Sequence, residues 1–511
     1  MKKNIMLFLI ASIMILVVGL LITSCGSWDN KFIGYYYGFG GNSGNSGSSR
    51  GNINGAVFII GGSLSSHNYS NYLYNWYNGV LFDGNNYYIS GWQQDSTDST
   101  RKYTVIKLNP DLTLNYAKYY TTDNNDIGLT NICFNPFDNN KLLIAGWNKN
   151  VINNGVLANN QINKGLLKPN PPGLIFSLDK ITGNLNIIKS YLDTGPIYIF
   201  NDPSNNRYLY LVGHYGHIIK LNLSNFSYIA KKVSNYSFEN IFVNNDYVAT
   251  YNNDSVNNNY GVVVAKKDLS QALIFYVNGN IHQVPLLDNN DNIYLIDKST
   301  NGNLVISKIN LNNFNNPNRI SSKEYNLTYT LNNSLISTSS TFLIDGNIVI
   351  GISNSSNINP DIHFLKINKD NLGIINEIRL SPKDSLGAGV TPQGNLGSMT
   401  MCLTPDGGFF ASRFSYYSFS EGDVSYDLRL GYALKISNNF ILDPNNCVFN
   451  VTNNQSNIIG DYNGNLNYVY ITNSMNNDSL FEDQNFTFSP QNVNTTVGCI
   501  NSVPNIMKNK K

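Results

Sequence analysis

The chain has 511 residues, of which only 13% are charged, and its 34 basic and 33 acidic side chains leave a formal net charge of +1. A strongly basic nucleic-acid binder would need clustered lysine and arginine, and a disordered polyelectrolyte would need a large net charge, so both classes are excluded. Asparagine is unusually common, with 88 residues, while 42% of the chain is hydrophobic. We therefore expect a globular protein with a sizeable core and an amide-rich surface.

The first 24 residues have the layout of an export signal. Lys2 and Lys3 precede a nearly unbroken apolar run over residues 5–22, and small residues lead to Cys25. This order of charge, apolar core and small residues is typical of a secretory signal peptide. An uncleaved anchor helix is the alternative, because the apolar run is just long enough to span a bilayer.

The junction Ser24-Cys25-Gly26 resembles the lipobox of bacterial lipoproteins. This resemblance implies cleavage before Cys25, lipidation of Cys25 and an extracytoplasmic location at the cell envelope. The second mature residue is not aspartate, which in Gram-negative lipoproteins favours the outer membrane. Residues 25–54 then form a tether, because residues 38–49 consist almost wholly of glycine, serine and asparagine, a composition typical of a flexible linker.

A pattern of short β-type runs recurs seven times between residues 78 and 449. Each copy has a turn rich in Asp, Asn and Gly, a strand that ends in a small residue, a variable loop, an apolar strand and a second turn. The first copy covers residues 83–120 and the second covers residues 138–191. One such unit cannot bury both of its faces, whereas radial stacking of several units buries them. The pattern predicts an all-β fold, a seven-bladed β-propeller, with six or eight blades as alternatives.

The run Val105-Ile106-Lys107-Leu108, which follows a strand closing on Gly91, resembles the β-propeller repeat of many secreted bacterial proteins. In that family an "apolar–Lys–Leu" strand is followed by a turn with glycine. The second copy keeps this glycine at Gly183, but the first copy has Leu112 there.

Two strand-like regions lie outside the seven copies. They are residues 56–62, at the start of the propeller expected over 55–450, and several runs within residues 451–511. Propellers close by pairing one terminus with the blade at the other, so we expect one of these regions to close the ring. The alternative for residues 451–511 is a small C-terminal extension with a disordered tail.

Four cysteines remain after Cys25 in a compartment that permits disulfides. They are Cys133, Cys402, Cys447 and Cys499, which allow three pairings. Cys447 and Cys499 flank the late region and are the candidate disulfide pair. Buried free thiols are the alternative, above all for Cys133 between Ile132 and Phe134.

Motifs for catalysis, cofactors or metal ions are missing from the sequence. His214 and His217 are the only clustered histidines, and no acid close in the sequence completes a metal site. We therefore predict neither a cofactor nor a metal ion, and we favour a non-catalytic protein. The alternative is a carbohydrate-active enzyme that would use two loop carboxylates among Asp95, Asp98 and Glu421.

Equivalent positions in the repeats supply the candidate ligand-binding residues. The residue after the small strand-ending residue is Trp92, Trp147, His214, Tyr251 or Arg413 in different copies. In a propeller these residues would surround one face, and aromatic faces beside amides suit sugars or peptides. The alternative is that Trp92 and Trp147 pack between blades.

The sequence as a whole predicts a lipid-anchored, extracytoplasmic propeller that acts as a non-catalytic binding or interaction module. Its expected partners are the membrane, through the lipid on Cys25, and an envelope protein or a glycan, but not nucleic acid. A surface carbohydrate-binding or carbohydrate-active protein and an outer-membrane assembly scaffold are the alternatives.

Overall fold

The computed structural model describes most of the chain between residues 55 and 498. The described residues are 55–61, 72–94, 101–121, 127–148, 173–191, 194–195, 197–233, 237–254, 259–278, 281–283, 285–327, 336–343, 345–354, 361–383, 390–394, 400–421, 424–443, 446–452, 456–471, 476–477, 489–492 and 495–498. The predicted signal peptide and tether, with Cys25, lie outside these residues.

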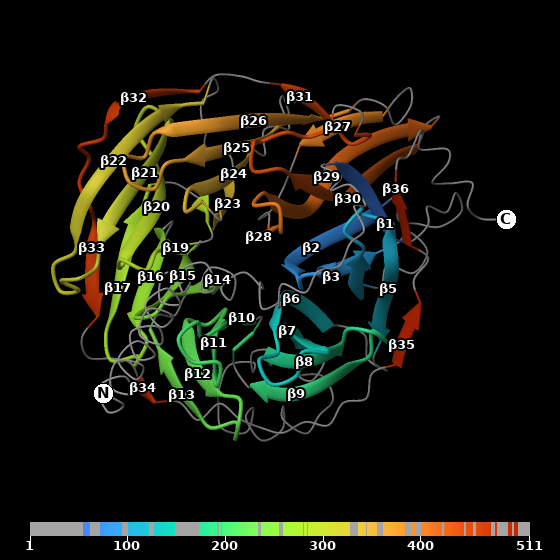
Figure 1. Ribbon diagram of the computed structural model, residues 1–511, viewed down its shortest axis with the longest axis horizontal. Coiled ribbons are helices and arrows are strands. Elements are labelled where there is room, and N and C mark those ends of the chain that lie inside the picture. The colour runs from blue at the N-terminus through green and yellow to red at the C-terminus, as the bar shows by residue number, and fades with distance from the viewer. Residues whose placement is uncertain are drawn as a thin grey trace, which may run out of the picture.

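Seven four-stranded antiparallel sheets surround a central axis, so the fold is the predicted all-β seven-bladed propeller (Figure 1). We number the strands of each blade outward from the axis. The first three blades are β2 (Tyr72–Phe82), β3 (Tyr87–Gln94), β4 (Arg101–Leu108) and β5 (Leu114–Thr121); β6 (Ile127–Phe134), β7 (Lys141–Asn148), β8 (Gly173–Asp179) and β9 (Leu185–Tyr191); and β10 (Ile197–Asn201), β11 (Tyr208–Gly213), β12 (His217–Asn222) and β13 (Tyr228–Lys232).

The next three blades follow the same order. They are β14 (Ser237–Val243), β15 (Tyr247–Asp254), β16 (Asn259–Lys266) and β17 (Ala272–Val277); β19 (Leu286–Leu287), β20 (Asn292–Lys298), β21 (Leu304–Asn310) and β22 (Asn318–Asn326); and β23 (Ile336–Phe342), β24 (Ile348–Asn354), β25 (Ile362–Ile367) and β26 (Ile374–Pro382). A short strand, β18 (Ile281–His282), pairs in parallel with β23.

The seventh blade contains strands from both ends of the propeller. Its first three strands are β28 (Thr400–Leu403), β29 (Phe409–Glu421) and β30 (Val424–Ile436), and its fourth is β1 (Ala56–Gly61). Ala56 pairs with Leu434 and Ile59 pairs with Gly431. Of the two regions considered for ring closure, the N-terminal one supplies the fourth strand of this blade. An additional strand, β27 (Val390–Gly394), pairs with the far end of β29.

The C-terminal region forms a belt around the outside of the propeller (Figure 1). We use the word belt for its six short strands, which run backward through the blades: β31 (Phe449–Thr452) on blade 6, β32 (Asn457–Asp461) on blade 5, β33 (Tyr468–Ile471) on blade 4, β34 (Asn476–Asn477) on blade 3, β35 (Ser489–Asn492) on blade 1 and β36 (Thr495–Gly498) on β1 of blade 7. The described part of this region is therefore not the separate extension considered as an alternative, because each strand adds to a blade edge.

The core consists of apolar side chains packed between neighbouring blades. Tyr87 of blade 1 stacks on Phe410 of blade 7 with ring centroids 4.2 Å apart. Similar clusters join each blade to the next around the ring. Radial stacking buries both faces of each sheet, and this burial supplies most of the folding free energy.

The turn that follows the third strand places one residue in the left-handed region in six blades. Gly183 occupies this position in blade 2 with φ of 71°. The other five residues have φ between 55° and 63° and are apolar: Leu112, Phe226, Leu269, Leu372 and Phe440. Four of them are buried and the fifth, Phe226, is 37% exposed. The departure seen at Leu112 is therefore the rule in this chain, because burial of the side chain offsets a backbone cost of about 1–2 kcal/mol.

Candidate binding site at the channel mouth

A cavity of about 790 Å³ lies where the central channel opens on one face of the disc. This face, which we call the turn face, carries the turns between the first and second strands and between the third and fourth strands. The cavity is lined by first-strand residues of six blades and by turn residues of blades 1, 2, 3 and 7, including Asp83, Asn139, Lys180 and Asn206. Its volume lies in the range of small-ligand sites.

Side-chain amides dominate the polar lining of this cavity. Ten asparagines contribute to it, from the channel wall and from the turns: Asn78, Asn85, Asn86, Asn131, Asn135, Asn139, Asn140, Asn201, Asn206 and Asn240. Phe134, Phe200 and Phe242 add apolar surface. The lining combines neutral donors and acceptors with aromatic rings, which is the chemistry that recognises neutral polar ligands.

Three of the four charged residues of the lining form ion pairs with other groups of the protein. Asp83 forms an ion pair with Lys180 at 3.4 Å, and Asp202 forms one with Lys267 at 2.6 Å. Lys107 donates to the carbonyl oxygen of Lys180 at 2.9 Å. Burial lowers the pKa of Lys107, and the nearby Asp83 opposes this shift. The cavity therefore offers a ligand little uncompensated charge.

Asparagine side chains also hold the wall of the cavity together between blades. The amide of Asn131 in blade 2 donates to the carbonyl oxygen of Ile199 at 2.7 Å and accepts from the Ile199 N–H at 2.9 Å. In the opposite direction, the side-chain amide of Asn201 in blade 3 donates to the carbonyl oxygen of Phe134 in blade 2 at 3.0 Å. These amides replace backbone pairing, because first strands of different blades are not paired in one sheet.

Gly79 permits a close approach between blades 1 and 2. A Cβ atom at this position would lie 2.7 Å from the Cα of Asn131 and 2.5 Å from the Oγ of Ser90. Any larger residue would push the first strand of blade 2 away from that of blade 1. The shape of this side of the cavity therefore depends on a glycine inside a strand.

The lysine of the "apolar–Lys–Leu" pattern joins neighbouring blades on the turn face. We call this contact the lysine clasp: a third-strand lysine donates to the backbone carbonyl oxygen of the first turn residue after the third strand of the next blade. Lys107 reaches Lys180, Lys220 reaches Lys267, Lys308 reaches Lys369 and Lys366 reaches Asn438, at 2.9, 3.5, 3.1 and 3.3 Å. Blades 2 and 4 have Ser177 and Ala265 at this position. The repeat signature thus marks a structural contact.

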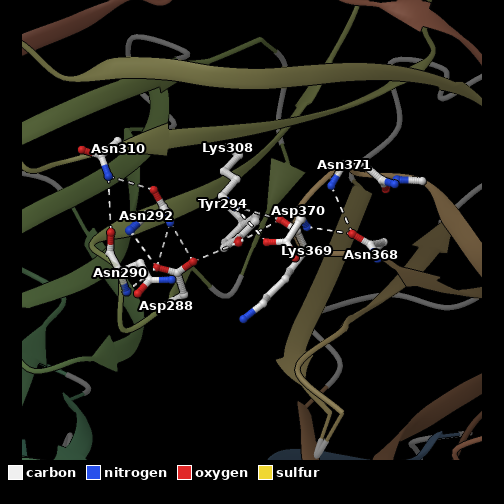
Figure 2. A network of polar contacts seen from close by, with 11 residues as sticks. Asp288, Asn290, Asn292, Tyr294, Lys308, Asn310, Asn368, Lys369, Asp370 and Asn371 are labelled. Atoms are coloured by element: carbon white, nitrogen blue, oxygen red, sulfur yellow. Dashed lines mark hydrogen bonds and ion pairs between the residues drawn. The ribbon is translucent and has the colours of Figure 1, made fainter.

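Figure 2 shows the clasp between blades 5 and 6. The hydroxyl of Tyr294 donates to Asp288 at 3.0 Å and to the carbonyl oxygen of Lys369 at 3.2 Å. Lys308 lies over the Tyr294 ring, 5.8 Å from its centroid, and 3.6 Å from Asp370. Asp288 also accepts hydrogen bonds from Asn292, so the first turn and the clasp form one network.

The five predicted ligand-binding residues lie away from this cavity. Four of them lie within second strands and His214 directly follows one, and none belongs to the lining of the cavity. Tyr251 and Arg413 are fully buried, with exposed fractions of 0% and 1%. Burial lowers the pKa of Arg413 to about 10 and lowers the pKa of His214 as well. A ligand role for the set stays a prediction.

The two tryptophans are half-buried and in contact with their own blades. The Trp147 indole covers Gly128, where a Cβ atom would lie 1.9 Å from Nε1. Trp92 packs against the apolar cluster between blades 1 and 2. The sequence does not reveal this cavity, because its asparagines come from several blades and share no motif. Six of them lie in turns before second strands, and this position is the signal that the sequence offers.

The remaining candidate residues have different positions. Cys133 and Cys402 are buried free thiols whose pKa values burial raises, whereas Cys447 is disulfide-bonded. Asp95, Asp98 and Cys499 lie outside the described residues, and Glu421 is the last residue of β29. Within the described part of the chain, no group of three or more His, Cys, Asp or Glu side chains is placed to hold a metal ion. That part also contains no helix long and apolar enough to cross a membrane.

No family model and no curated protein matches the chain. Solved structures do match: the WD40 domain of coronin from Toxoplasma gondii has 8% sequence identity and a TM-score of 0.41, covering 76% of this chain and 90% of that one. KlHsv2 with loop 6CD replaced by a Gly-Ser linker has 10% identity and a TM-score of 0.37, covering 75% and 98%.

Proposed function

We propose that this protein is a lipid-anchored, extracytoplasmic binding module that holds a neutral oligosaccharide in the cavity of the turn face. The observation that carries the proposal is the lining of that cavity. Ten amides and three phenylalanine rings surround a volume of about 790 Å³ in which the acidic side chains are paired with lysines. Sugars present hydroxyl groups for amides and flat apolar faces for aromatic rings.

The path of the chain connects the cavity with the proposed anchor. The backbone N–H of Lys435 donates to the carbonyl oxygen of Gly55 at 2.8 Å, and Ala56 pairs with Leu434 at the end of the third strand of blade 7. The chain thus enters β1 from the turn face. A tether of residues 25–54 would leave the disc on the face that carries the cavity. The disulfide at Cys447 supports an extracytoplasmic compartment.

Binding to a glycan array tests the ligand. The mature chain carrying Cys25→Ser should bind neutral oligosaccharides, with little change between low and high salt because no charge pairing is involved. Asn139→Ala and Asn206→Ala each should weaken binding by about tenfold, the effect of roughly 1.4 kcal/mol. Asn315→Ala is the matched control, because Asn315 is an exposed turn residue of blade 5 outside the lining. Salt-sensitive binding to acidic glycans alone, or equal binding by all variants, would refute the proposal.

Metabolic labelling with an alkyne fatty acid tests the anchor. The wild-type protein should incorporate the label and stay with membranes, and Cys25→Ser should lose both properties. Intact-mass measurement of the mature protein should show that it begins at residue 25. A mature chain that retains residues 1–24 without a lipid would contradict the lipoprotein assignment and favour the uncleaved anchor helix.

A further inference from the structure

The belt begins on blade 6 and ends on the neighbouring blade 7. It starts after Cys447 with β31 on blade 6 and ends at Gly498 with β36, which pairs with β1 in blade 7. Between these ends it contacts the outer edges of blades 5, 4, 3 and 1. Since β1 lies between β30 and β36, the end of the belt covers the strand that closes the propeller.

Side chains fasten the belt at several points along this path. The backbone N–H of Ser456 donates to Glu377 at 2.7 Å, and Glu377 also contacts His363 at 3.1 Å. Lys323 forms an ion pair with Asp461, and Arg319 donates to the carbonyl oxygen of Gly464. Most of these contacts are at least partly exposed, so they hold the belt less firmly than buried contacts would.

The belt strands also have few buried side chains. Phe449 is buried against Tyr432, with ring centroids 5.0 Å apart, but Ile459 and Val469 are 54% and 47% exposed. Short exposed strands contribute little to stability by themselves. A covalent link at its ends would hold the belt in place without a larger core.

The partner of Cys447 follows from the other cysteines and from the strand register. Cys447 is disulfide-bonded, while Cys133 and Cys402 are free, so the partner is Cys25 or Cys499. The Cys447 thiol sulfur lies 3.8 Å from the carbonyl oxygen of Ala56. In the antiparallel pairing of β36 with β1, Gly498 lies opposite Phe58, two residues from Ala56 on the same strand. The last described residue before Cys499 and the contact of the Cys447 thiol sulfur therefore both lie on β1.

We propose that Cys447 and Cys499 form a disulfide that closes the belt into a covalent ring around the propeller. Formation of the bond removes two electrons and two protons from the two thiols, and a disulfide-bearing oxidant takes them up by thiol–disulfide exchange. The bond ties blade 7, β1 and the last belt strand together. The belt is thus a lock on ring closure that an oxidising compartment sets and a reductant releases.

Peptide mapping of the full chain without reduction tests the link directly. We expect a Cys447–Cys499 peptide that disappears on reduction, and a Cys25–Cys447 peptide or free Cys499 would overturn the proposal. A specific protease site inserted between Asn463 and Gly464 gives a second test. After cleavage, the protein should run as one species without reductant and as two fragments with it. Two fragments in the absence of reductant would contradict a closed ring.

The contribution of this disulfide to stability can be measured with cysteine variants. Cys447→Ser, Cys499→Ser and the double variant should lower the thermal midpoint by the same amount, because each removes the same bond. Cys25→Ser is the matched control and should leave the midpoint unchanged. Should the variants fail to fold, hydrogen exchange on the wild type provides the measurement: reductant should speed exchange in β36 and β1 at least tenfold and leave β20 unchanged. Equal exchange with and without reductant would refute the lock.

Discussion

We call the packed interfaces between neighbouring blades joints. The joints and the belt both involve β-strands, but they are stabilised in different ways. At the joints, large apolar residues such as Tyr87 and Phe410 are fully buried and the lysine clasps have little exposure. In the belt, the strands have two to five residues and many of their side chains are exposed. The joints depend on side-chain burial, whereas the belt depends mainly on backbone pairing with edges that the blades have already formed.

This difference predicts that equivalent changes have unequal effects in the two regions. A residue lost at a joint removes buried contacts from two blades at once. A residue lost in the belt removes a contact that water can replace. The joints should therefore determine global stability, and the belt should determine protection of the blade edges.

The largest effect is expected at the left-handed turn residues of the joints. Leu372 is fully buried with φ of 57°. Leu372→Ala should reduce the free energy of unfolding by about 2–5 kcal/mol through lost burial. Leu372→Gly should cost about 0.5–1 kcal/mol less than Leu372→Ala, because glycine relieves the left-handed backbone.

Leu365 in β25 provides the control for that comparison, since it is equally buried within a regular strand. There the free energy of unfolding should be lower for Leu365→Gly than for Leu365→Ala. The strand backbone has no left-handed strain for glycine to relieve, and glycine loses more conformational entropy on folding. Urea unfolding of the four variants measures both orders. The same order at both positions would contradict the role assigned to the left-handed turn.

A smaller effect is expected from ion pairs, and it should differ between joint and belt. Lys366 contacts Asp345 at 2.7 Å and Asn438 Oδ1 at 2.7 Å with 8% of its side chain exposed. Lys366→Met should reduce the free energy of unfolding by about 2 kcal/mol, because it removes a nearly buried cation from its ion pair and its hydrogen bonds. Lys323→Met at the belt pair with Asp461, which is 72% exposed, should cost less than about 1 kcal/mol. Chemical denaturation of both variants measures these changes. An equal loss in the free energy of unfolding would contradict the difference between ion pairs in the joints and in the belt.

The smallest effect concerns the pH dependence of one joint. Burial, with the negative charges of Asp246 and Asp288, raises the pKa of Asp291 to about 6. Since the pKa in the unfolded chain is about 3.9, the contribution of this group to stability is fully present below about pH 4 and is lost as the pH rises through 6.

Asp291→Asn should therefore stabilise the protein at pH 7.5 by less than about 1 kcal/mol, because solvent screens this partly exposed group. Asparagine tolerates the φ of 58° found at this residue, so the turn itself should be kept. At pH 4.5 the gain should be much smaller. Urea unfolding at the two pH values measures it, and an equal gain at both would exclude titration of Asp291 as the cause.

The blades could be predicted from the sequence because their signals are local. Asp-Gly and Asn-Gly turns, alternating strands and the "apolar–Lys–Leu" run lie within a few residues of one another, and hairpin pairing follows from them. The high asparagine content is also partly explained at this level. Asn244 and Asn368, for example, accept hydrogen bonds from backbone N–H groups two or three residues further on, as turn residues commonly do.

The candidate site could not be predicted in the same way. Trp92, Trp147, His214, Tyr251 and Arg413 are equivalent in the repeats, but equivalence does not indicate whether a side chain faces a neighbouring blade or a ligand. The cavity instead combines Asn78, Asn131 and Asn240 from first strands with turn residues of four blades. These residues come together only when the ring is closed.

By itself, the sequence determined the number and local form of the blades, the candidate disulfide cysteines and the predicted export signal, because each rests on residues close together in the chain or on their types. Only the tertiary structure decided that the N-terminal strand closes the ring, that the C-terminal strands form a belt and that the cavity lies on the turn face. Pairing between chain ends requires a preformed edge, and the edge exists only after the blades have stacked and buried their faces.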